Sequence, residues 1–166
     1  MAEALLITRT DLVKFTAMNG NVDTDKFIQY IKISQDIHIQ GYLGTDLLQK
    51  IQADIVAGTL AGDYLTLVET YIKPMLIHFA MVEYLPYAAY TIANKGIYKH
   101  SSENSENVDK IEVDFLIEKE RKVAEHYVQR FIDYMCFNSA TYPEYNTNSN
   151  GDVNPSKDNF FSGWIL

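Results

Sequence analysis

The run PMLIHFAMVEYLP, from Pro74 to Pro86, decides the fold of this chain. Apolar residues fall on nearly every side of a helix drawn through it, which is typical of a helix that other helices cover all round. We therefore expect it to form the middle of a longer helix over residues 64 to about 94, capped by Asp63. Each proline lacks a backbone N–H and disturbs the preceding turn, so kinks are predicted at both, with Pro86 the stronger break.

Three helices are expected before this central one, of which two precede Gly41. The first begins after Thr8, because a hydroxyl there can accept the free N–H groups of a first turn. The second is capped by Asp23 and runs to about Gln40. Its three- and four-residue spacing predicts one buried stripe, made of Phe27, Tyr30, Ile31, Ser34, Ile37 and Gly41.

Two more helices complete the predicted bundle. Thr45 is expected to cap a third helix that ends before Gly58, and the last helix covers residues 108 to about 137, after a polar loop at residues 99–107. The apolar positions of the last helix keep a helical period: Val108, Ile111, Phe115, Ala124, Tyr127, Val128, Phe131 and Met135. Strand-like alternation is not sustained over several segments. The predicted fold class is therefore all-α, a single bundle of about five helices in residues 1–138.

The amino-acid composition of the sequence changes after residue 138. Residues 146–151 consist only of Asn, Thr, Ser and Gly, and such a run buries too little apolar surface to fold alone. Residues 139–166 are therefore predicted to form an extended C-terminal arm. The arm ends in FFSGWIL, residues 160–166, which needs a pocket either in its own subunit or in a neighbour. We assign protein interaction to Tyr142, Tyr145, Phe160, Phe161, Trp164, Ile165 and Leu166.

The charge and the cysteine content of the chain limit the kinds of partner and compartment that we expect. The 166 residues carry a formal net charge of −8, with a pI near 4.9, unlike proteins that hold nucleic acid through Lys and Arg. Cys136 is the single cysteine, which excludes an intramolecular disulfide and favours a reducing compartment. The N-terminal residues lack a secretory pattern, and His78, Glu83 and Pro86 interrupt the apolar run at residues 75–93. We expect a cytosolic chain without a membrane span.

No catalytic, cofactor or metal site is predicted. The histidines His38, His78, His100 and His126 lie on separate elements, and none forms an HExxH pair. His78, in the apolar helix, is expected to be a hydrogen-bonded core residue rather than a ligand. Glu83 on the same helix is expected to pair with Lys, Arg or Tyr, or to lie at a subunit interface, ahead of acting as a catalytic acid.

Several blocks of the sequence occur in a characteristic order. They are LLITR at 5–9, GNVD at 20–23, GYLGT at 41–45, GDYLTL at 62–67, YIKP at 71–74, and GIYKH at 96–100 followed by ENSE at 103–106. In this succession the chain resembles a helical family of phages and prophages of Bacteroidetes. That family is similar to the head-tail connector (adaptor) proteins, which dock as a ring under the portal vertex of tailed bacteriophages.

The resemblance implies a structural virion protein without enzymatic activity or cofactor. About a dozen copies would form a collar that extends the portal channel and offers a platform to the next tail or neck protein. DNA would pass through without specific binding, and an acidic lumen would let it slide. The subunit would be assembled in the host cytoplasm and located in the neck of the virion, its arm clasping a neighbour or the portal.

Two other functions are compatible with the sequence. The chain can be a monomeric or dimeric helical module that holds one partner with its aromatic end, which its mass in solution would distinguish from a ring. An enzyme of unrecognised type is the third hypothesis, and a cleft with Glu83 and His78 within hydrogen-bonding reach of each other would favour it.

Overall fold

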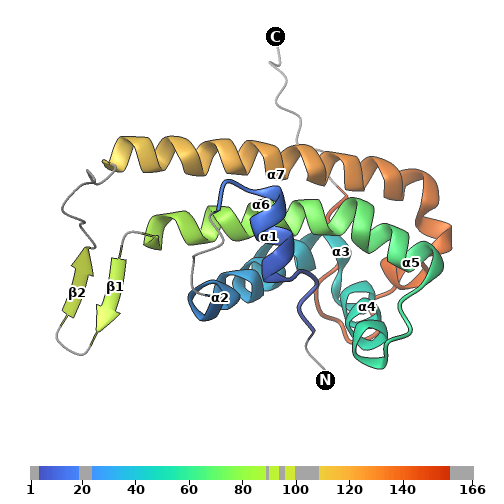
Figure 1. The fold of residues 1–166 in the computed structure, drawn as a ribbon. Helices are drawn as coiled ribbons and strands as arrows, with labels where there is room; N and C mark the ends of the chain where they lie inside the picture. Colours follow the sequence, from blue (N-terminus) through green and yellow to red (C-terminus); the bar gives the residue numbers. More distant parts are fainter. Residues whose placement is uncertain (1–3, 19–23, 89, 94–95, 100–108, 158–166) are drawn as a thin grey trace, which may run out of the picture.

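The computed structural model describes residues 4–18, 24–88, 90–93, 96–99 and 109–157 of the chain (Figure 1). Its helices pack into one bundle, which confirms the predicted all-α class. The elements before the central helix are α1 (Arg9–Phe15), α2 (Thr24–Ser34), the π-helical turn η1 (Gln35–Ile39), α3 (Gln40–Leu43) and α4 (Thr45–Ala57). Thr8 caps α1 as predicted, in a capping box with Asp11, and Gly58 ends α4 with a left-handed φ of 66°.

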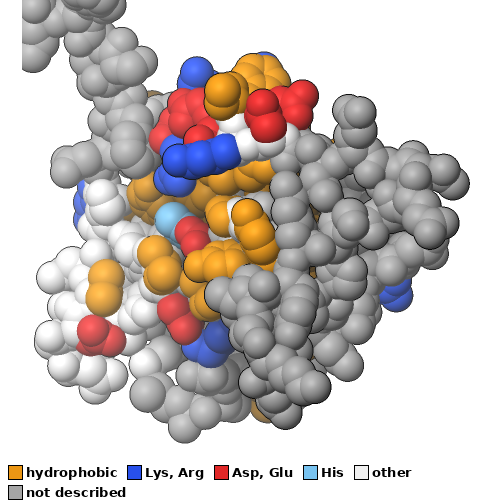
Figure 2. All heavy atoms as spheres, turned by 90° about the vertical axis from the view of Figure 1, so that its left-hand side faces the viewer, with side chains coloured by type: hydrophobic (Ala, Val, Ile, Leu, Met, Phe, Trp, Pro, Cys, Tyr) orange, Lys and Arg blue, Asp and Glu red, His pale blue; other side chains and the backbone are white. Residues whose placement is uncertain are grey.

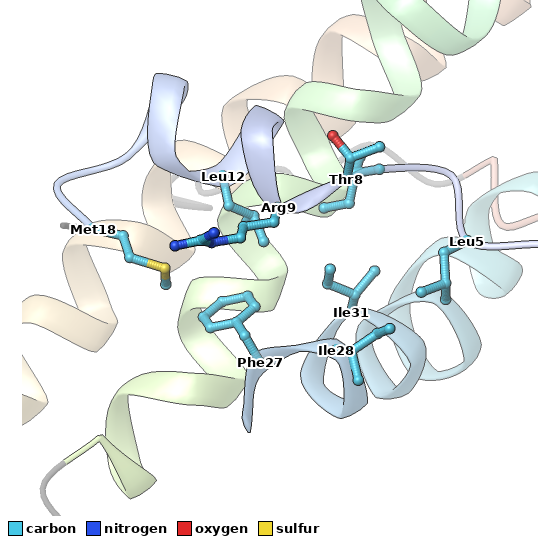
Figure 3. Close-up of a pocket in the computed structure, with 9 residues that line it drawn as sticks. Leu5, Thr8, Arg9, Leu12, Met18, Phe27, Ile28 and Ile31 are labelled. Carbon is cyan, nitrogen blue, oxygen red and sulfur yellow. The ribbon is translucent and has the colours of Figure 1, made fainter. Parts of the chain in front are cut away.

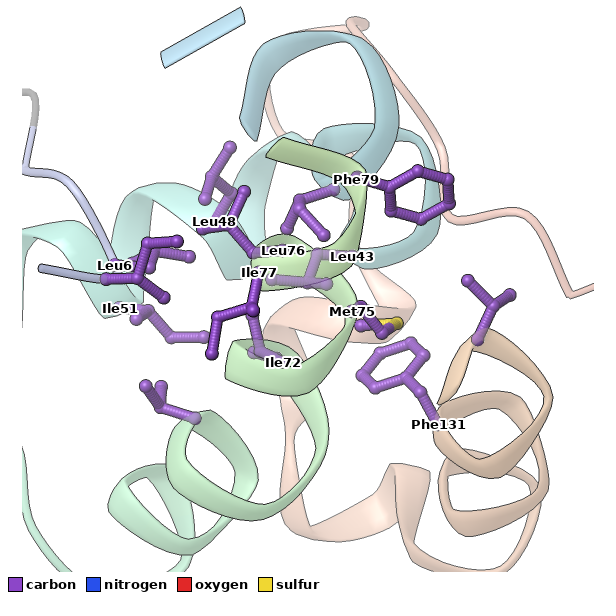
Figure 4. Packing of buried hydrophobic residues seen from close by; sticks show 14 of the residues in the cluster. Leu6, Leu43, Leu48, Ile51, Ile72, Met75, Leu76, Ile77, Phe79 and Phe131 are labelled. Atoms are coloured by element: carbon purple, nitrogen blue, oxygen red, sulfur yellow. The ribbon is translucent and has the colours of Figure 1, made fainter. Parts of the chain in front are cut away.

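The predicted central helix is confirmed as the core of the bundle. It consists of α5 (Gly62–Leu67), the π-helical turn η2 (Val68–Ile72) and α6 (Lys73–Tyr84). The buried residues of α6 are Met75, Leu76, Ile77, Phe79, Ala80, Met81 and Val82. Figure 4 shows how Leu43 and Leu48 reach this helix from one side and Phe131 from another. Phe131 belongs to α7 (Lys110–Asn138), which lies alongside α6 (Figure 1).

The two prolines act differently. Pro74 stands at the start of α6, directly after η2, where the helix accommodates the missing backbone donor by widening to a π turn. Pro86 ends the helix within a 3-10 turn, Leu85–Tyr87. The predicted continuation to residue 94 is wrong. Residues 90–93 instead form β1 (Tyr90–Ala93), which pairs in antiparallel register with β2 (Gly96–Lys99). Beyond Pro86 the aromatic and β-branched residues Tyr90 to Ile92 favour a strand.

The second helix is buried along a different stripe from the predicted one. Phe27, Ile31 and Ser34 are buried as expected, but Ile37 is 63% exposed and Ile39 is fully buried in its place. The cause is η1, because its i→i+5 turn inserts one residue, so the next buried apolar side chain falls five residues after Ser34, at Ile39, rather than three or four residues after it. Gln35 becomes buried through this shift. Its side chain accepts a hydrogen bond from Leu6 N at 3.0 Å and donates one to the carbonyl of Ala4 at 3.0 Å.

The arm, as far as residue 157, lies against its own bundle. Two short 3-10 turns, Ser139–Thr141 and Pro143–Asn146, lead from α7 into an extended segment. Thr45 holds that segment through its backbone N–H, which donates to the carbonyl of Val153 at 3.0 Å. Gly44 has a φ of 76°, and a Cβ at this position would lie 2.8 Å from the Cδ of Pro155. The glycine therefore permits both the helix break between α3 and α4 and the close passage of the arm.

The central helix also meets the length and apolarity of a membrane span. An 18-residue window within Gly62–Tyr87 has a mean hydropathy of 1.2, but 56% of that window is buried inside the bundle. The apolar side chains are therefore used inside the bundle, since α1, α2 and α7 contact the helix from several sides.

Candidate protein-interaction surfaces

The first half of α7 exposes large apolar side chains. Ile111 is 77% exposed, Phe115 is 63% exposed and Leu116 is 44% exposed. The buried residues of the helix begin only at Ala124. At about 100° per residue, Ile111 and Phe115 point away from the side on which Ala124 and Val128 meet the core. This part of a rigid helix offers an apolar surface to the outside, which is typical of a contact with another protein.

The same end of the bundle carries further aromatic residues. Tyr87 and Tyr90 are both about half exposed, and the Tyr87 ring stacks on that of Tyr30 with 5.8 Å between centroids. Tyr30 in turn packs edge-on against Tyr84 at 5.5 Å. Figure 2 looks onto this end and shows hydrophobic side chains exposed among charged ones. Tyrosine combines apolar area with a polar tip, so this surface suits an interface that is partly wet.

The opposite end of α7 carries one protruding ring. Phe137, in the last turn of the helix, is 90% exposed, the largest value among the large hydrophobic residues that the structure describes. Its neighbour Cys136 is a free, exposed thiol. The two ends of one helix therefore both present apolar groups, as a subunit that contacts neighbours on two different faces requires.

An apolar pocket opens between α1 and α2 (Figure 3). Its cavity volume is about 80 Å³, and its lining is mainly apolar. The lining residues are Leu5, Ile7, Thr8, Arg9, Leu12, Met18, Phe27, Ile28 and Ile31. Ile28 is 48% exposed at the edge, whereas Leu12, Phe27 and Ile31 are buried beneath it. The pocket has the character of a receptor for a large apolar side chain.

Two histidine–carboxylate pairs join neighbouring helices. His38 Nε2 lies 2.9 Å from Glu83 Oε1, and the His38 ring stacks on Phe79 with 4.1 Å between centroids. His78 Nδ1 lies 2.7 Å from Glu120 Oε2. The first pair joins η1 to α6 and the second joins α6 to α7. The pairing expected for Glu83 is present, but its partner is a histidine rather than Lys, Arg or Tyr. His78 and Glu83 do not bond to each other.

A second, more polar hollow lies beside His78. It contains Lys73, which pairs with Glu69 at 2.8 Å and lies 3.9 Å from Asp11. Phe15, Ile77 and Tyr127 complete most of its wall. Within the described ranges, no three His, Cys, Asp or Glu side chains are grouped as a metal site would need. The charges of Asp11, Glu69 and Lys73 neutralise one another, and the pair of Lys73 with Asp11 links α6 to α1.

The predicted interaction residues fall into two groups. Tyr142 and Tyr145 are buried in the core of their own subunit, so their surface is already used there. The Tyr142 hydroxyl donates to the carbonyl of Asp63 at 3.1 Å, and its burial raises its pKa well above the usual range. Burial also raises the pKa of Tyr145 to about 12. The remaining residues, Phe160, Phe161, Trp164, Ile165 and Leu166, lie outside the described part of the chain.

The exposed residues Ile28, Phe115 and Phe137 were not assigned to interaction from the sequence. Ile28 does carry a signal, since it stands next to Phe27 and off the stripe predicted for its helix. Phe115 carries a signal too, because it stands nine positions before Ala124 and therefore on the opposite side of the helix. Which side of α7 is covered is a property of the packed bundle and does not follow from the spacing alone.

Comparison with known proteins identifies the family. Residues 39–155 match a family described as a family of unknown function (DUF6712). The chain belongs to this family. The DUF6712 region begins within η1 and ends at the residue that contacts Gly44, so it includes the central helix, α7 and the docked part of the arm. The pocket between α1 and α2 and the apolar C-terminal residues both lie outside it. No curated protein and no solved structure matches the chain.

Proposed function

We propose that the chain is a structural subunit of a ring between the portal and the tail of a tailed bacteriophage, a head-tail connector. The observation that carries this proposal is the exposure of large apolar side chains at both ends of a rigid helix, Ile111 and Phe115 at one and Phe137 at the other. A closed ring of identical copies needs two different faces on each copy. The resemblance in the order of the sequence blocks supplies the specific place in the virion.

The charge of the chain suits a conduit for DNA. With a net charge of −8, a ring of about a dozen copies would carry a strongly negative potential, which repels phosphate groups. DNA would therefore pass through the lumen without being held. The partners in this proposal are further copies of the chain, the portal protein and the next tail or neck protein.

The pairing of the ionisable groups supports a scaffold rather than a catalyst. His38, Glu83, His78 and Glu120 are committed to bonds between helices. Such bonds fix the relative position of η1, α6 and α7, and a rigid subunit can dock repeatedly in the same geometry. This proposal requires no enzymatic activity.

Mixing the full chain with the portal protein of the same phage tests the proposal. Size-exclusion chromatography with light scattering should show a complex that contains several copies of the chain for each portal ring, and electron microscopy should show an added collar. A chain that stays monomeric or dimeric and leaves the portal unchanged would contradict the proposal. That result would favour the helical interaction module instead.

A further inference from the structure

The C-terminal residues and the pocket between α1 and α2 have matching chemistry. Residues 160–166, FFSGWIL, contain five large apolar side chains in seven positions. The pocket is lined by Leu5, Leu12, Met18 and Ile28 among others, and Figure 3 shows these side chains directed toward one space. Its cavity volume of about 80 Å³ allows one side chain to enter, rather than a whole segment. A single aromatic ring of the C-terminal residues would fill the apolar space.

The described chain ends on another side of the bundle from the pocket. The Ser156 N–H donates to the carbonyl of Gly41 at 2.8 Å, and Lys157 Nζ lies 5.1 Å from the centre of the Tyr145 ring. The arm thus arrives beside α3, which packs on Phe79 of α6 through Tyr42. The pocket is walled by α1, which approaches the side of α6 that carries Lys73, and Figure 1 shows α1 crossing on the near side of α6.

The length of the C-terminal segment and the path that it would follow favour insertion into a neighbouring copy rather than into the same copy. Six residues separate Lys73 from Phe79, which puts them about 120° apart around α6. Residues 158–166 span about 30 Å when extended, so length alone allows several targets. To enter its own pocket the segment would have to double back along η1 and α2, which lead from α3 to the pocket. A pocket presented by an adjacent copy requires no such detour.

We propose that residues 160–166 of one copy insert an aromatic side chain into the pocket between α1 and α2 of the next copy. The proposal rests on the proposed ring, and it names the contact that closes it. The pocket and the apolar C-terminal residues form two different, complementary faces of one chain, so the contact is head-to-tail and can close into a ring.

Trp164 makes the test direct, because it is the only tryptophan of the chain. Wild-type chain is held at a trace concentration, and full-length chain carrying Trp164→Phe, which has no tryptophan, is added up to about 1 mM, enough to populate a contact with a Kd of about 100 μM. The emission maximum of Trp164 should move to shorter wavelength as the added chain increases. Adding Ile28→Glu to the tryptophan-free chain should abolish that shift.

Ile37→Glu in the tryptophan-free chain is the matched control. Ile37 is an exposed isoleucine on the same continuous helix but does not line the pocket, so this variant should still produce the shift. Circular dichroism checks that both glutamate variants keep their helices.

Three outcomes would overturn the inference. They are an emission maximum already shifted at trace concentration and insensitive to added chain, an exposed tryptophan at every concentration, and a shift that survives Ile28→Glu. The first would place the segment in its own copy. If any of these occurs while the chain still adds a collar to the portal, the contact is refuted and the proposed connector stands. Failure on the portal refutes the connector itself.

Discussion

Both halves of α7 contain large apolar residues, but their surroundings differ. In the second half, Ala124, Val128 and Phe131 are buried, whereas in the first half Ile111 and Phe115 are exposed. Each half keeps a helical spacing, but at about 100° per residue Ile111 and Phe115 lie on the opposite side of the helix from Ala124 and Val128. The difference teaches that a period reports where apolar residues line up on a helix, but not whether the same chain supplies the partner that covers them.

The arm helps to cover the second half of α7. Tyr145 packs on Phe131 with 6.1 Å between ring centroids, and the Tyr142 hydroxyl lies 2.9 Å from that of Tyr134. These contacts add to those that α6 makes with α7. We therefore expect substitutions that loosen the arm to expose apolar side chains in the second half of α7, as they are exposed in the first half.

The sharpest test of this contrast compares two phenylalanines of one helix. Phe131→Ala removes a fully buried ring and should lower the free energy of unfolding by about 3–5 kcal/mol, because it leaves a cavity. Phe115→Ala should change it by less than about 0.5 kcal/mol, because the ring is largely in water. Urea denaturation followed by circular dichroism measures both.

Phe115→Ala has a second expected effect, on assembly. The variant should weaken the complex with the portal while leaving the isolated subunit intact, since the side chain is available to a neighbour. A large loss of stability in the isolated Phe115→Ala chain would contradict the division of α7 into a covered and an uncovered half.

A smaller effect is expected at the point where the arm passes the bundle. Gly44→Ala puts a Cβ at a backbone φ of 76° and within 2.8 Å of Pro155, and should cost about 1–3 kcal/mol. Hydrogen exchange should then show faster exchange at the Ser156 amide, which is bonded to Gly41.

Gly41→Ala is the control for that experiment. A Cβ at Gly41 would meet nothing within 4 Å, and its φ is not positive. Since alanine favours a helix over glycine by up to about 1 kcal/mol, this variant should be neutral or slightly more stable. Equal destabilisation by both substitutions would show that the close passage of the arm at Gly44 has no special role.

Removing the buried hydroxyl of the arm should have a smaller effect again. Tyr142→Phe keeps the ring and loses the bonds to the Asp63 carbonyl and the Tyr134 hydroxyl, which should cost about 1 kcal/mol. Thermal denaturation compares this variant with Tyr90→Phe, whose side chain is half exposed and which should behave like the wild type. A stable Tyr142→Phe chain would mean that ring packing alone fixes this part of the arm.

The smallest effect concerns pH. Bonds from the backbone N–H and hydroxyl of Ser149, and then from the hydroxyl of Thr147, hold the pKa of Asp46 below its ordinary value of 3.8. A pKa lowered on folding stabilises the fold above the unfolded value, and this contribution is lost as pH falls through the folded value. The amide signal of Ser149 in an NMR titration should therefore change with a midpoint below 3.8.

Asp46→Asn supplies the comparison for the titration. Without the carboxylate, the Ser149 amide should lose this pH dependence, and the segment that it anchors should exchange faster with solvent at neutral pH. A midpoint at or above the ordinary value in the wild type would mean that these bonds do not favour the charged carboxylate.

Local signals in the sequence were sufficient for much of the fold. The cap at Thr8, the left-handed Gly58 and the break at Pro86 each follow from the chemistry of one or two residues. The central helix follows from apolarity on all its sides. The hairpin was missed because the apolar run continues across Pro86 into Tyr90 and Ile92, and composition alone does not separate a buried helix from a strand.

The rest depends on contacts between distant segments. The π turn η1 moves burial from Ile37 to Ile39, and a strict helical period does not contain that shift. The sequence indicated that Glu83 needed a partner, but His38 is 45 residues away along the chain. The docking of the arm was likewise one of two open possibilities, and bonds from Thr45 and Asp46 decide it only as far as residue 157.

Cryo-electron microscopy of the virion neck tests the central claim most directly. If the uncovered apolar surfaces serve assembly, the bundle should appear as a closed ring of identical copies beneath the portal, with Ile111, Phe115 and Phe137 in contact with other subunits. A neck without density for this bundle, or a ring in which all three side chains face solvent, would contradict the claim.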